Sequence, residues 1–279
     1  MRYVLIFSMI IDCHAHLSTY DDDALIPYAR SNSLSYSLAE LLENMKRFEV
    51  TDALLLSPPR VDGSIVPNEH TIRLCELSNW RLKPVLTVEP SKEHVESCIK
   101  LAKSKKQVRA FKIRLGYVKV SPIDPVFLPL YEYALSSGLP VLFHTGDTAT
   151  KRASLKHAHP LNLDELASSF DKLKIVVCHF GNPWIVDAAE LVYKHNNVYA
   201  DLSGLFSGYT RFSKKYIETL VSQLNRAIYY IGSVDRILFG TDYPVEDHER
   251  AIQLVKSLDL DENELKLVFY ENAKGLFAL

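Results

Sequence analysis

Two histidines separated by a single residue close a short apolar run near the start of the sequence. Residues 9–11 (MII) are typical of a β-strand, and they lead directly into residues 12–16 (DCHAH). Alternate side chains of a strand share a face, so we expect Asp12, His14 and His16 to point the same way. Two neighbouring imidazoles supply half of the ligands of a divalent metal ion, so the other half must come from elsewhere in the chain.

Five further ionisable side chains end or follow short apolar runs along the chain. They are Lys112, Arg114, His144, His179 and Asp242. Imidazole nitrogens together with a carboxylate suit Zn²⁺ or a similar first-row ion. Lys112 and Arg114 are two residues apart in one run and so share its face, where both suit an anionic substrate. Arg114 offers two parallel hydrogen bonds to a carboxylate.

The elements that carry these residues repeat in a regular order. From residue 9 onward, β-rich runs alternate with segments whose apolar residues recur at helical spacing. We predict eight strands, at residues 9–14, 53–56, 84–88, 108–114, 140–144, 175–179, 198–202 and 236–241. Eight βα units in about 250 residues predict a distorted (β/α)8 TIM barrel of the α/β class rather than an open sheet. The active site of such a barrel is built at the carboxyl ends of its strands, which brings the candidate residues together.

We expect residues 1–279 to form one domain with its core at residues 9–279, because no repeat or Pro/Gly/Ser-rich linker divides the chain. Residues 1–8 are either an N-terminal extension of the first strand or a leader before a start at Met9. They do not fit a signal peptide, since Ser8 interrupts the apolar stretch and cleavage would fall within the histidine motif. A last apolar pattern predicts an additional C-terminal helix on the barrel exterior. It consists of Leu265, Val268, Phe269, Ala273, Leu276 and Phe277.

The composition favours a small-molecule partner. Lys and Arg number 32 against 34 Asp and Glu, and the net charge of -2 provides no basic field for non-specific nucleic-acid binding. Neither nucleic acid nor a membrane is expected as a partner, while a homo-oligomer stays open. The four cysteines form no C-x-x-C pair, which argues against a zinc knuckle and a disulfide framework and favours a reducing, cytoplasmic setting.

Taken together, the motifs resemble the amidohydrolase superfamily, and within it the amidohydrolase 2 branch of metal-dependent hydrolases and aminocarboxymuconate semialdehyde decarboxylase-like proteins. A single H-x-H is a weak signal, whereas the full set in the family's order at successive strand ends is specific. The matching segments are Asp12-Cys13-His14-Ala15-His16, His144-Thr145-Gly146, His179-Phe180-Gly181-Asn182-Pro183, Gly240-Thr241-Asp242-Tyr243-Pro244 and Tyr270-Glu271-Asn272-Ala273.

The resemblance implies one divalent metal ion, Zn²⁺ first and Mn²⁺ as the alternative. His14, His16 and His144 would be its imidazole ligands. Asp242 would complete the site and accept a proton from the metal-bound water, while His179 would polarise the reacting group. Three neutral ligands and one carboxylate leave the ion electrophilic enough to bring the pKa of its water towards neutrality.

Lys112 leaves the number of metal ions open, because some superfamily members carry a carboxylated lysine on strand four that bridges two ions. In that case His144 and His179 would bind the second ion. We favour one ion, with Lys112 and Arg114 binding a substrate carboxylate. Asp201 and Ser203 end a predicted strand on its inward face, where they either support the site or fill the barrel.

Alternation along the strands turns Cys13 and Cys178 outward against the helices, as structural thiols. The loop at residues 205–212 could line a pocket for a cyclic or aromatic anion. Its candidate side chains are Phe206, Tyr209, Arg211 and Phe212.

The leading functional hypothesis is a metal-dependent hydrolase of a small carboxylated substrate, such as a lactone or a related compound with a C–O or C–N bond. Activated water would attack while Asp242 takes its proton and His179 stabilises the oxyanion. The alternative is a lyase, a non-oxidative decarboxylase of the aminocarboxymuconate semialdehyde or resorcylate type. A non-catalytic barrel that retains the motifs is the third hypothesis, and the complete ligand set argues against it.

Overall fold

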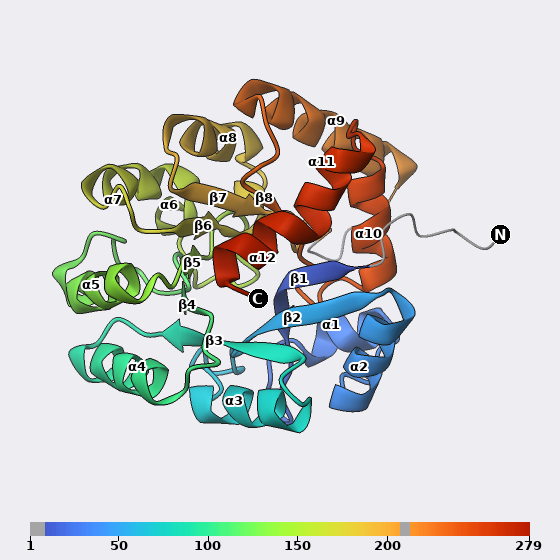
Figure 1. Cartoon of the computed structure of the whole chain (residues 1–279). Helices are drawn as coiled ribbons and strands as arrows, with labels where there is room; N and C mark the ends of the chain where they lie inside the picture. Colours follow the sequence, from blue (N-terminus) through green and yellow to red (C-terminus); the bar gives the residue numbers. More distant parts are fainter. Residues whose placement is uncertain (1–8, 207–212) are drawn as a thin grey trace.

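The computed structural model describes residues 9–206 and 213–279 (Figure 1). Eight parallel strands form one sheet in sequence order, and helices surround it, so the predicted (β/α)8 barrel is confirmed. The strands are β1 (Ile10–His16), β2 (Val50–Leu56), β3 (Leu82–Val88), β4 (Ala110–Ile113), β5 (Val141–Phe143), β6 (Ile175–Val177), β7 (Val198–Asp201) and β8 (Ile237–Leu238).

The helices that follow the strands differ widely in length. They are α1 (Ile26–Ser31), α2 (Leu38–Arg47), α3 (Asn68–Leu77), α4 (Lys92–Ser104), α5 (Leu128–Ser137), α6 (Leu155–Ala158), α7 (Asp164–Ser169), α8 (Ile185–Lys194), α9 (Lys214–Ile231), α10 (His248–Lys256), α11 (Glu262–Lys266) and α12 (Asn272–Phe277). Ser37, Ser91 and Asp247 begin α2, α4 and α10 by accepting a hydrogen bond from a backbone N–H of the first turn. Within the described residues, no helix is long and apolar enough to cross a bilayer.

The strand side chains alternate between two core layers, as β2 illustrates. Ala53 and Leu55 pack in the layer between the strands and the surrounding helices. Leu54 and Leu56 belong to the layer inside the barrel, together with apolar residues of the other strands. Each strand is thus covered on both faces, which explains why its sequence is apolar nearly throughout.

The barrel closes through the segment that follows β8, because β8 itself is only two residues long. The backbone N–H of Asp242 donates to the carbonyl of His14 at 2.7 Å, and the N–H of His16 donates to the carbonyl of Tyr243 at 2.7 Å. These bonds place Asp242 beside both histidines of β1.

Strands β4 to β8 all end earlier than predicted. The run at 175–179, for example, leaves the ladder after Val177, and Cys178–Gly181 form a 3₁₀ turn. The shortened ends lie where the candidate residues gather, since these residues leave the regular strand conformation. Residues 1–8, and with them the question of an N-terminal extension, lie outside the described residues, as do Tyr209, Arg211 and Phe212 of the predicted pocket loop.

The C-terminal segment covers one end of the barrel. Figure 1 shows α12 crossing the middle of the ring of strands. Its Ala273, Leu276 and Phe277 pack with the apolar residues inside the barrel. The additional C-terminal helix is present, but its last part closes the amino end of the barrel instead of lying on the exterior, because these apolar side chains fill the open end of the inner layer.

Candidate metal centre

A bulge interrupts β1 where the histidine motif begins. The register against β2 shifts between Asp12 and Ala15, so the intervening residues do not alternate regularly. The side chains of the two consecutive residues Cys13 and His14 both face the interior of the barrel. Cys13 packs with the apolar residues inside the barrel, and His14 Nδ1 lies 3.1 Å from a carboxylate oxygen of Asp201. The bulge therefore resets the alternation within the motif.

Asp12 consequently lies on the other side of β1 from His14 and His16. Its Oδ2 accepts a hydrogen bond from Thr241 Oγ1 at 2.6 Å and lies 3.5 Å from Nε2 of His248 on α10. Its Oδ1 accepts hydrogen bonds from the backbone N–H groups of His14 and Thr241, both at 3.0 Å. The prediction that Asp12 shares the histidines' face is wrong. Instead its carboxylate joins β1 to the segment after β8.

A left-handed turn after β6 brings His179 into the barrel. The angle φ is +61° at His179 and +45° at Phe180, a region that few side chains adopt. Regular alternation along β6 has already turned Cys178 inward, where its Sγ lies 2.9 Å from Lys112 Nζ. The prediction that Cys13 and Cys178 face the helices is therefore wrong: a bulge and a turn, and not alternation, orient the histidine beside each thiol.

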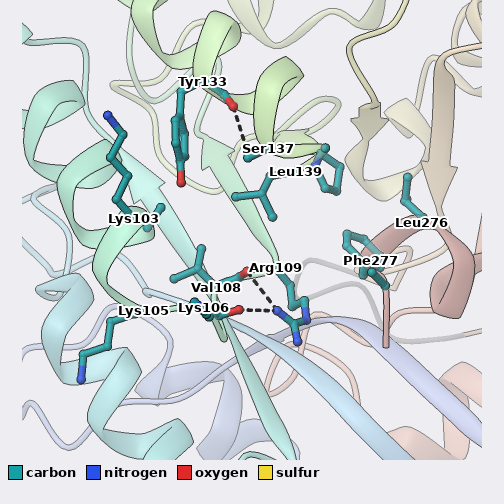
Figure 2. Close-up of a pocket in the computed structure, with 14 residues that line it drawn as sticks. Lys103, Lys105, Lys106, Val108, Arg109, Tyr133, Ser137, Leu139, Leu276 and Phe277 are labelled. Atoms are coloured by element: carbon teal, nitrogen blue, oxygen red, sulfur yellow. Dashed lines mark hydrogen bonds between the residues drawn. The ribbon is translucent and has the colours of Figure 1, made fainter.

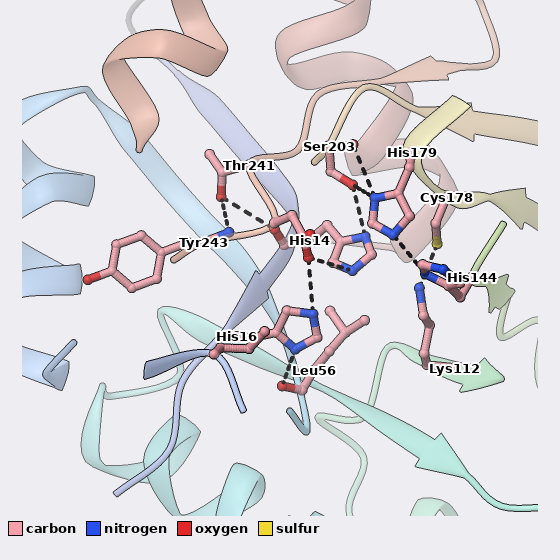
Figure 3. A network of polar contacts seen from close by, with 12 residues as sticks. His14, His16, Leu56, Lys112, His144, Cys178, His179, Ser203, Thr241 and Tyr243 are labelled. Carbon is pink, nitrogen blue, oxygen red and sulfur yellow. Dashed lines mark hydrogen bonds and ion pairs between the residues drawn. The ribbon is translucent and has the colours of Figure 1, made fainter. Parts of the chain in front are cut away.

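Three predicted ligands, His14, His16 and Asp242, converge at the carboxyl end of the barrel. Figure 3 shows two of them, His14 and His16. The Nε2 atoms of His14 and His16 lie 3.4 and 3.2 Å from Oδ1 of Asp242, and one donor atom from each residue lies within 4.8 Å of the others. The Nδ1 of His14 contacts Asp201, and the Nδ1 of His16 contacts the carbonyl of Leu56, both at 3.1 Å. These acceptors assign the proton to Nδ1, so two Nε2 lone pairs face a carboxylate. Such an arrangement of electron-rich atoms fits a cation between them.

Asp242 is ionised at neutral pH. Burial by itself raises the pKa of its carboxyl, but the close approach of His16, His179 and His14 outweighs burial and holds the pKa well below its usual range. Its backbone is left-handed, with φ of +58°. An ionised carboxylate in this position suits both a metal ligand and a proton acceptor.

Asp201 and Ser203 contact both His14 and His179 and so connect these two histidines. Oδ1 of Asp201 accepts hydrogen bonds from the backbone N–H of His179 at 2.8 Å and from Ser203 Oγ at 2.5 Å, while Oδ2 contacts His14. Burial raises the pKa of Asp201, but its contact with His14 outweighs burial and keeps the carboxylate ionised. Ser203 Oγ also lies 3.0 Å from His179 Nδ1. These contacts favour support of the site over simple packing.

His144 lies beside His179 and outside the group of three. Its Nδ1 is 3.1 Å from His179 Nε2, and its Nε2 is 3.0 Å from the carbonyl oxygen of Asp147. The rings of His14 and His179 are 4.9 Å apart between centroids, so the two groups adjoin. The structure thus brings His14, His16 and Asp242 together, and His144 and His179 form a second pair next to them.

His14, His144 and His179 are neutral at neutral pH. Burial lowers the pKa of His14 to about 4, and the charge of Lys112 adds to the effect. Burial also lowers the pKa of His179, and lowers that of His144 well below its usual value, where His179 and Lys112 contribute further. Neutral imidazoles are the form that binds a metal ion.

The two predicted substrate-binding residues differ in their surroundings. Lys112 is 3% exposed and lies deep in the barrel, where Figure 3 shows its amine beside Cys178 and His144. Arg114 Nη2 donates to Glu89 Oε1 at 2.8 Å and to the carbonyl of Gly63 at 3.0 Å. Arg114 Nε is buried and has no hydrogen-bond partner in the described part of the chain. Part of the guanidinium is therefore engaged, and part is free.

Tyr117 and Glu246 also border the site, and sequence reasoning did not select them. The ring of Tyr117 lies 4.8 Å from that of His144 and 5.9 Å from the guanidinium carbon of Arg114. Glu246 is 1% exposed and accepts a hydrogen bond from the backbone N–H of Phe206. Both residues follow a strand-end motif by three or four positions, but many loop residues do so, and this spacing alone distinguishes neither.

We compared the chain with known protein families. A model of the Amidohydrolase family, Amidohydro_2, matches residues 11–279. The chain belongs to this amidohydrolase family. The match confirms the resemblance to this family that the sequence motifs indicated, and it extends over nearly the whole chain. A search of curated proteins gives no match.

Solved structures share the fold of this amidohydrolase. An amidohydrolase from Burkholderia multivorans with bound Zn superposes with a TM-score of 0.74 at 17% identity, covering 97% of this chain and 99% of that one. A probable 2-pyrone-4,6-dicarboxylic acid hydrolase from Acinetobacter baumannii with bound citric acid gives 0.70 at 17%, with 97% and 99% covered. A dihydroxybenzoic acid decarboxylase from a Polaromonas species, with manganese and 2-nitroresorcinol bound, gives 0.70 at 16%, with 98% of each chain covered.

Proposed function

We propose that this amidohydrolase is a metal-dependent enzyme that acts on a small carboxylated substrate, with hydrolysis of a lactone or a related C–O or C–N bond as its reaction. The observation that carries the proposal is the convergence of His14 Nε2, His16 Nε2 and Asp242 Oδ1. Each atom is available for a ligand bond, and the partners of the two Nδ1 atoms hold the rings in place.

We propose one divalent ion held by His14, His16 and Asp242, with His144 turning from its contact with His179 to serve as the third imidazole. The donors are nitrogen and oxygen atoms, which suit both Zn²⁺ and Mn²⁺, and Zn²⁺ is the first choice for a site of three imidazoles and one carboxylate. Lys112 supports a single ion, because its amine contacts Cys178 Sγ and its charge lies close to His144. A second cation beside an unmodified ammonium group would be repelled.

When bound, the ion supplies a Lewis acid that lowers the pKa of water and polarises a carbonyl group. Asp242 takes the proton from the attacking water at its carboxylate, which is ionised for that purpose. In this proposal His179 stabilises the charge that develops on the reacting oxygen, which requires a proton on its Nε2, the atom that lies 3.1 Å from His144 Nδ1. Asp201 keeps His14 and His179 in position through its two oxygens.

Substrate binding is assigned to Arg114 and Lys112. Arg114 has a buried Nε without a partner in the described residues, which a substrate carboxylate would satisfy. Lys112 adds a positive charge inside the barrel, close to His144. We further propose that the chain works as one domain in a reducing compartment such as the cytoplasm, which suits its four free, buried cysteines.

The test combines metal analysis with Asp242→Asn. We expect the variant to fold, and to lose activity against its substrate by at least about a hundredfold, because general-base catalysis alone contributes that much. Asp235→Asn, which changes an exposed aspartate before β8, is the matched control and should keep full activity. Activity that survives Asp242→Asn with the metal still bound would contradict the mechanism.

Non-oxidative decarboxylation of a hydroxybenzoate or a muconate is the second candidate, favoured by the decarboxylase with bound manganese among the similar folds. A lactone panel and a panel of hydroxybenzoates and muconates separate the two reactions. Ring opening without CO₂ release supports the hydrolase, and CO₂ release supports the decarboxylase. A purified protein that binds no divalent ion would support the non-catalytic barrel instead.

A further inference from the structure

A cavity lies at the opposite end of the barrel from the metal centre. It has a volume of about 430 Å³, and the segments that enter β4 and β5 line it together with the ends of α4 and α12 (Figure 2). These segments precede their strands, whereas the candidate ligands follow theirs. The two sites are therefore separated by the length of the barrel.

Basic side chains surround this cavity, and no Asp or Glu lines it. Four of the lining residues are basic, and one of them, Lys105, pairs with Glu76 at 3.0 Å. The other three, Lys103, Lys106 and Arg109, form no ion pair with a carboxylate in residues 9–206 and 213–279. Lys174 adds a further cation, because its amine contacts the carbonyl oxygens of the lining residues Gly138 and Leu276 at 3.4 Å. In a chain of net charge -2, this unpaired positive charge favours an anion.

Arg109 gives the cavity a fixed donor. Its Nη1 donates to the carbonyl oxygens of Lys106 at 2.7 Å and Val108 at 3.4 Å, which holds the guanidinium in place. Its Nε is buried and lacks a hydrogen-bond partner among the residues that the structure describes. A buried donor without a partner is costly, and an oxyanion on that edge of the guanidinium would satisfy it.

The rest of the wall is apolar. Tyr133 and Leu139 line the cavity as partly exposed side chains, while Leu276 and Phe277, which also border it, are buried in the core. Figure 2 shows Arg109 between Val108 and Phe277. A bare inorganic ion would leave this apolar surface in contact with water. A ligand that combines an oxyanion with an aromatic or aliphatic body would cover both parts.

We propose that this basic cavity is a second ligand site, which binds a small organic oxyanion through Arg109 and its apolar body against Tyr133 and Leu139. The proposal does not depend on the reaction at the metal centre. The charged group is a carboxylate or a phosphate, since both match the edge of a guanidinium.

The experiment titrates the metal-loaded protein calorimetrically with benzoate, phenyl phosphate, inorganic phosphate and benzyl alcohol. We expect one or both aromatic anions to bind, and Arg109→Gln to weaken that binding by about tenfold or more, through the loss of a charge-assisted contact. Arg226→Gln, an exposed arginine on α9, should leave it unchanged. Lys103→Gln should weaken it less.

The preference between benzoate and phenyl phosphate identifies the charged group. Equal affinity of wild type and Arg109→Gln would place the anion at the metal centre and overturn the proposal, as would the absence of any aromatic anion binding. Inorganic phosphate or benzyl alcohol that binds as tightly as the aromatic anions would overturn the assigned ligand class. Turnover by Arg109→Gln should match the wild type, which separates this site from the proposed active site.

Discussion

His14 and His16 owe their availability as ligands to atoms that would never touch the metal ion. The acceptors at their Nδ1 atoms, Asp201 Oδ2 and the Leu56 carbonyl oxygen, fix the tautomer that leaves Nε2 free. Burial adds to this by lowering the pKa of His14 to about 4, so that no proton competes for the lone pair at neutral pH. The sequence could suggest the imidazoles, but it could not reveal which nitrogen each one presents.

Asp201→Asn tests this arrangement at the scale of one carboxylate. The amide cannot accept hydrogen bonds from His14 and His179 at both ends, so we expect the metal affinity to fall by about 10–100-fold. Competition with a chromophoric chelator measures it. Asp171→Asn, an exposed aspartate in the turn before β6, serves as the control. An unchanged affinity would show that Asp201 only fills space.

Glu246 predicts a dependence of stability on pH. Burial raises its pKa well above the usual value of 4.5, so the folded protein holds a proton that the unfolded chain releases. Its stabilising contribution is complete below the unfolded pKa and is lost as the pH rises through the folded pKa.

Relative to Glu246→Gln, the wild type should therefore lose stability as the pH rises above the usual carboxyl pKa of 4.5 towards the raised pKa of the folded protein. Urea unfolding of both proteins at several pH values gives the difference in unfolding free energy. A difference that stays constant with pH would contradict the buried, protonated carboxyl. The substitution keeps the acceptor for the Phe206 N–H, so any change reflects the proton.

At the scale of elements, the strands and their order followed from apolar runs alone, because strands covered on both faces must be apolar. The side-chain directions at their ends did not follow. Alternation assumes a regular strand, whereas β1 bulges after Asp12 and the chain turns left-handed at His179 and Asp242. Bulges and left-handed turns at non-glycine residues leave no reliable mark in one sequence, which is why the directions of Asp12, Cys13 and Cys178 were predicted wrongly.

Thr241→Val tests the connection between β1 and the segment after β8. Thr241 Oγ1 donates to Asp12 Oδ2 and accepts from the Tyr243 N–H at 3.0 Å, and valine of similar shape can do neither. We expect a loss of about 1–3 kcal/mol in unfolding free energy, because buried polar groups remain without partners. Thr219→Val, at an exposed position on α9, should change the value little. Equal effects of the two substitutions in urea unfolding would count against this role.

At the scale of the whole molecule, the two ends of the barrel are covered by different kinds of side chain. Polar and ionisable side chains occupy the carboxyl end, and α12 closes the amino end with apolar ones. The sequence predicted a C-terminal helix but not its place, because an apolar face shows that a helix is covered without showing by what.

Phe277→Ala measures what the closure by α12 contributes. Phe277 is 2% exposed and packs with the apolar residues inside the barrel, so its removal should cost about 3–5 kcal/mol of unfolding free energy. Leu155→Ala, at a half-exposed leucine of α6, is the control and should cost much less. A small loss in Phe277→Ala, measured by urea unfolding, would mean that α12 is not part of the core.

The contacts of Asp12 with Thr241 join residues 229 positions apart. The three candidate ligands, from His14 to Asp242, span nearly the same interval. Such non-local pairing belongs among the slow steps of folding. The entropy of closing this loop rises only slowly with its length, so a circular permutant that joins the end of α12 to the start of β1 should change the refolding rate more than the final stability. The time at which a refolding chain first binds a divalent ion would then report when β1 and the segment after β8 come together.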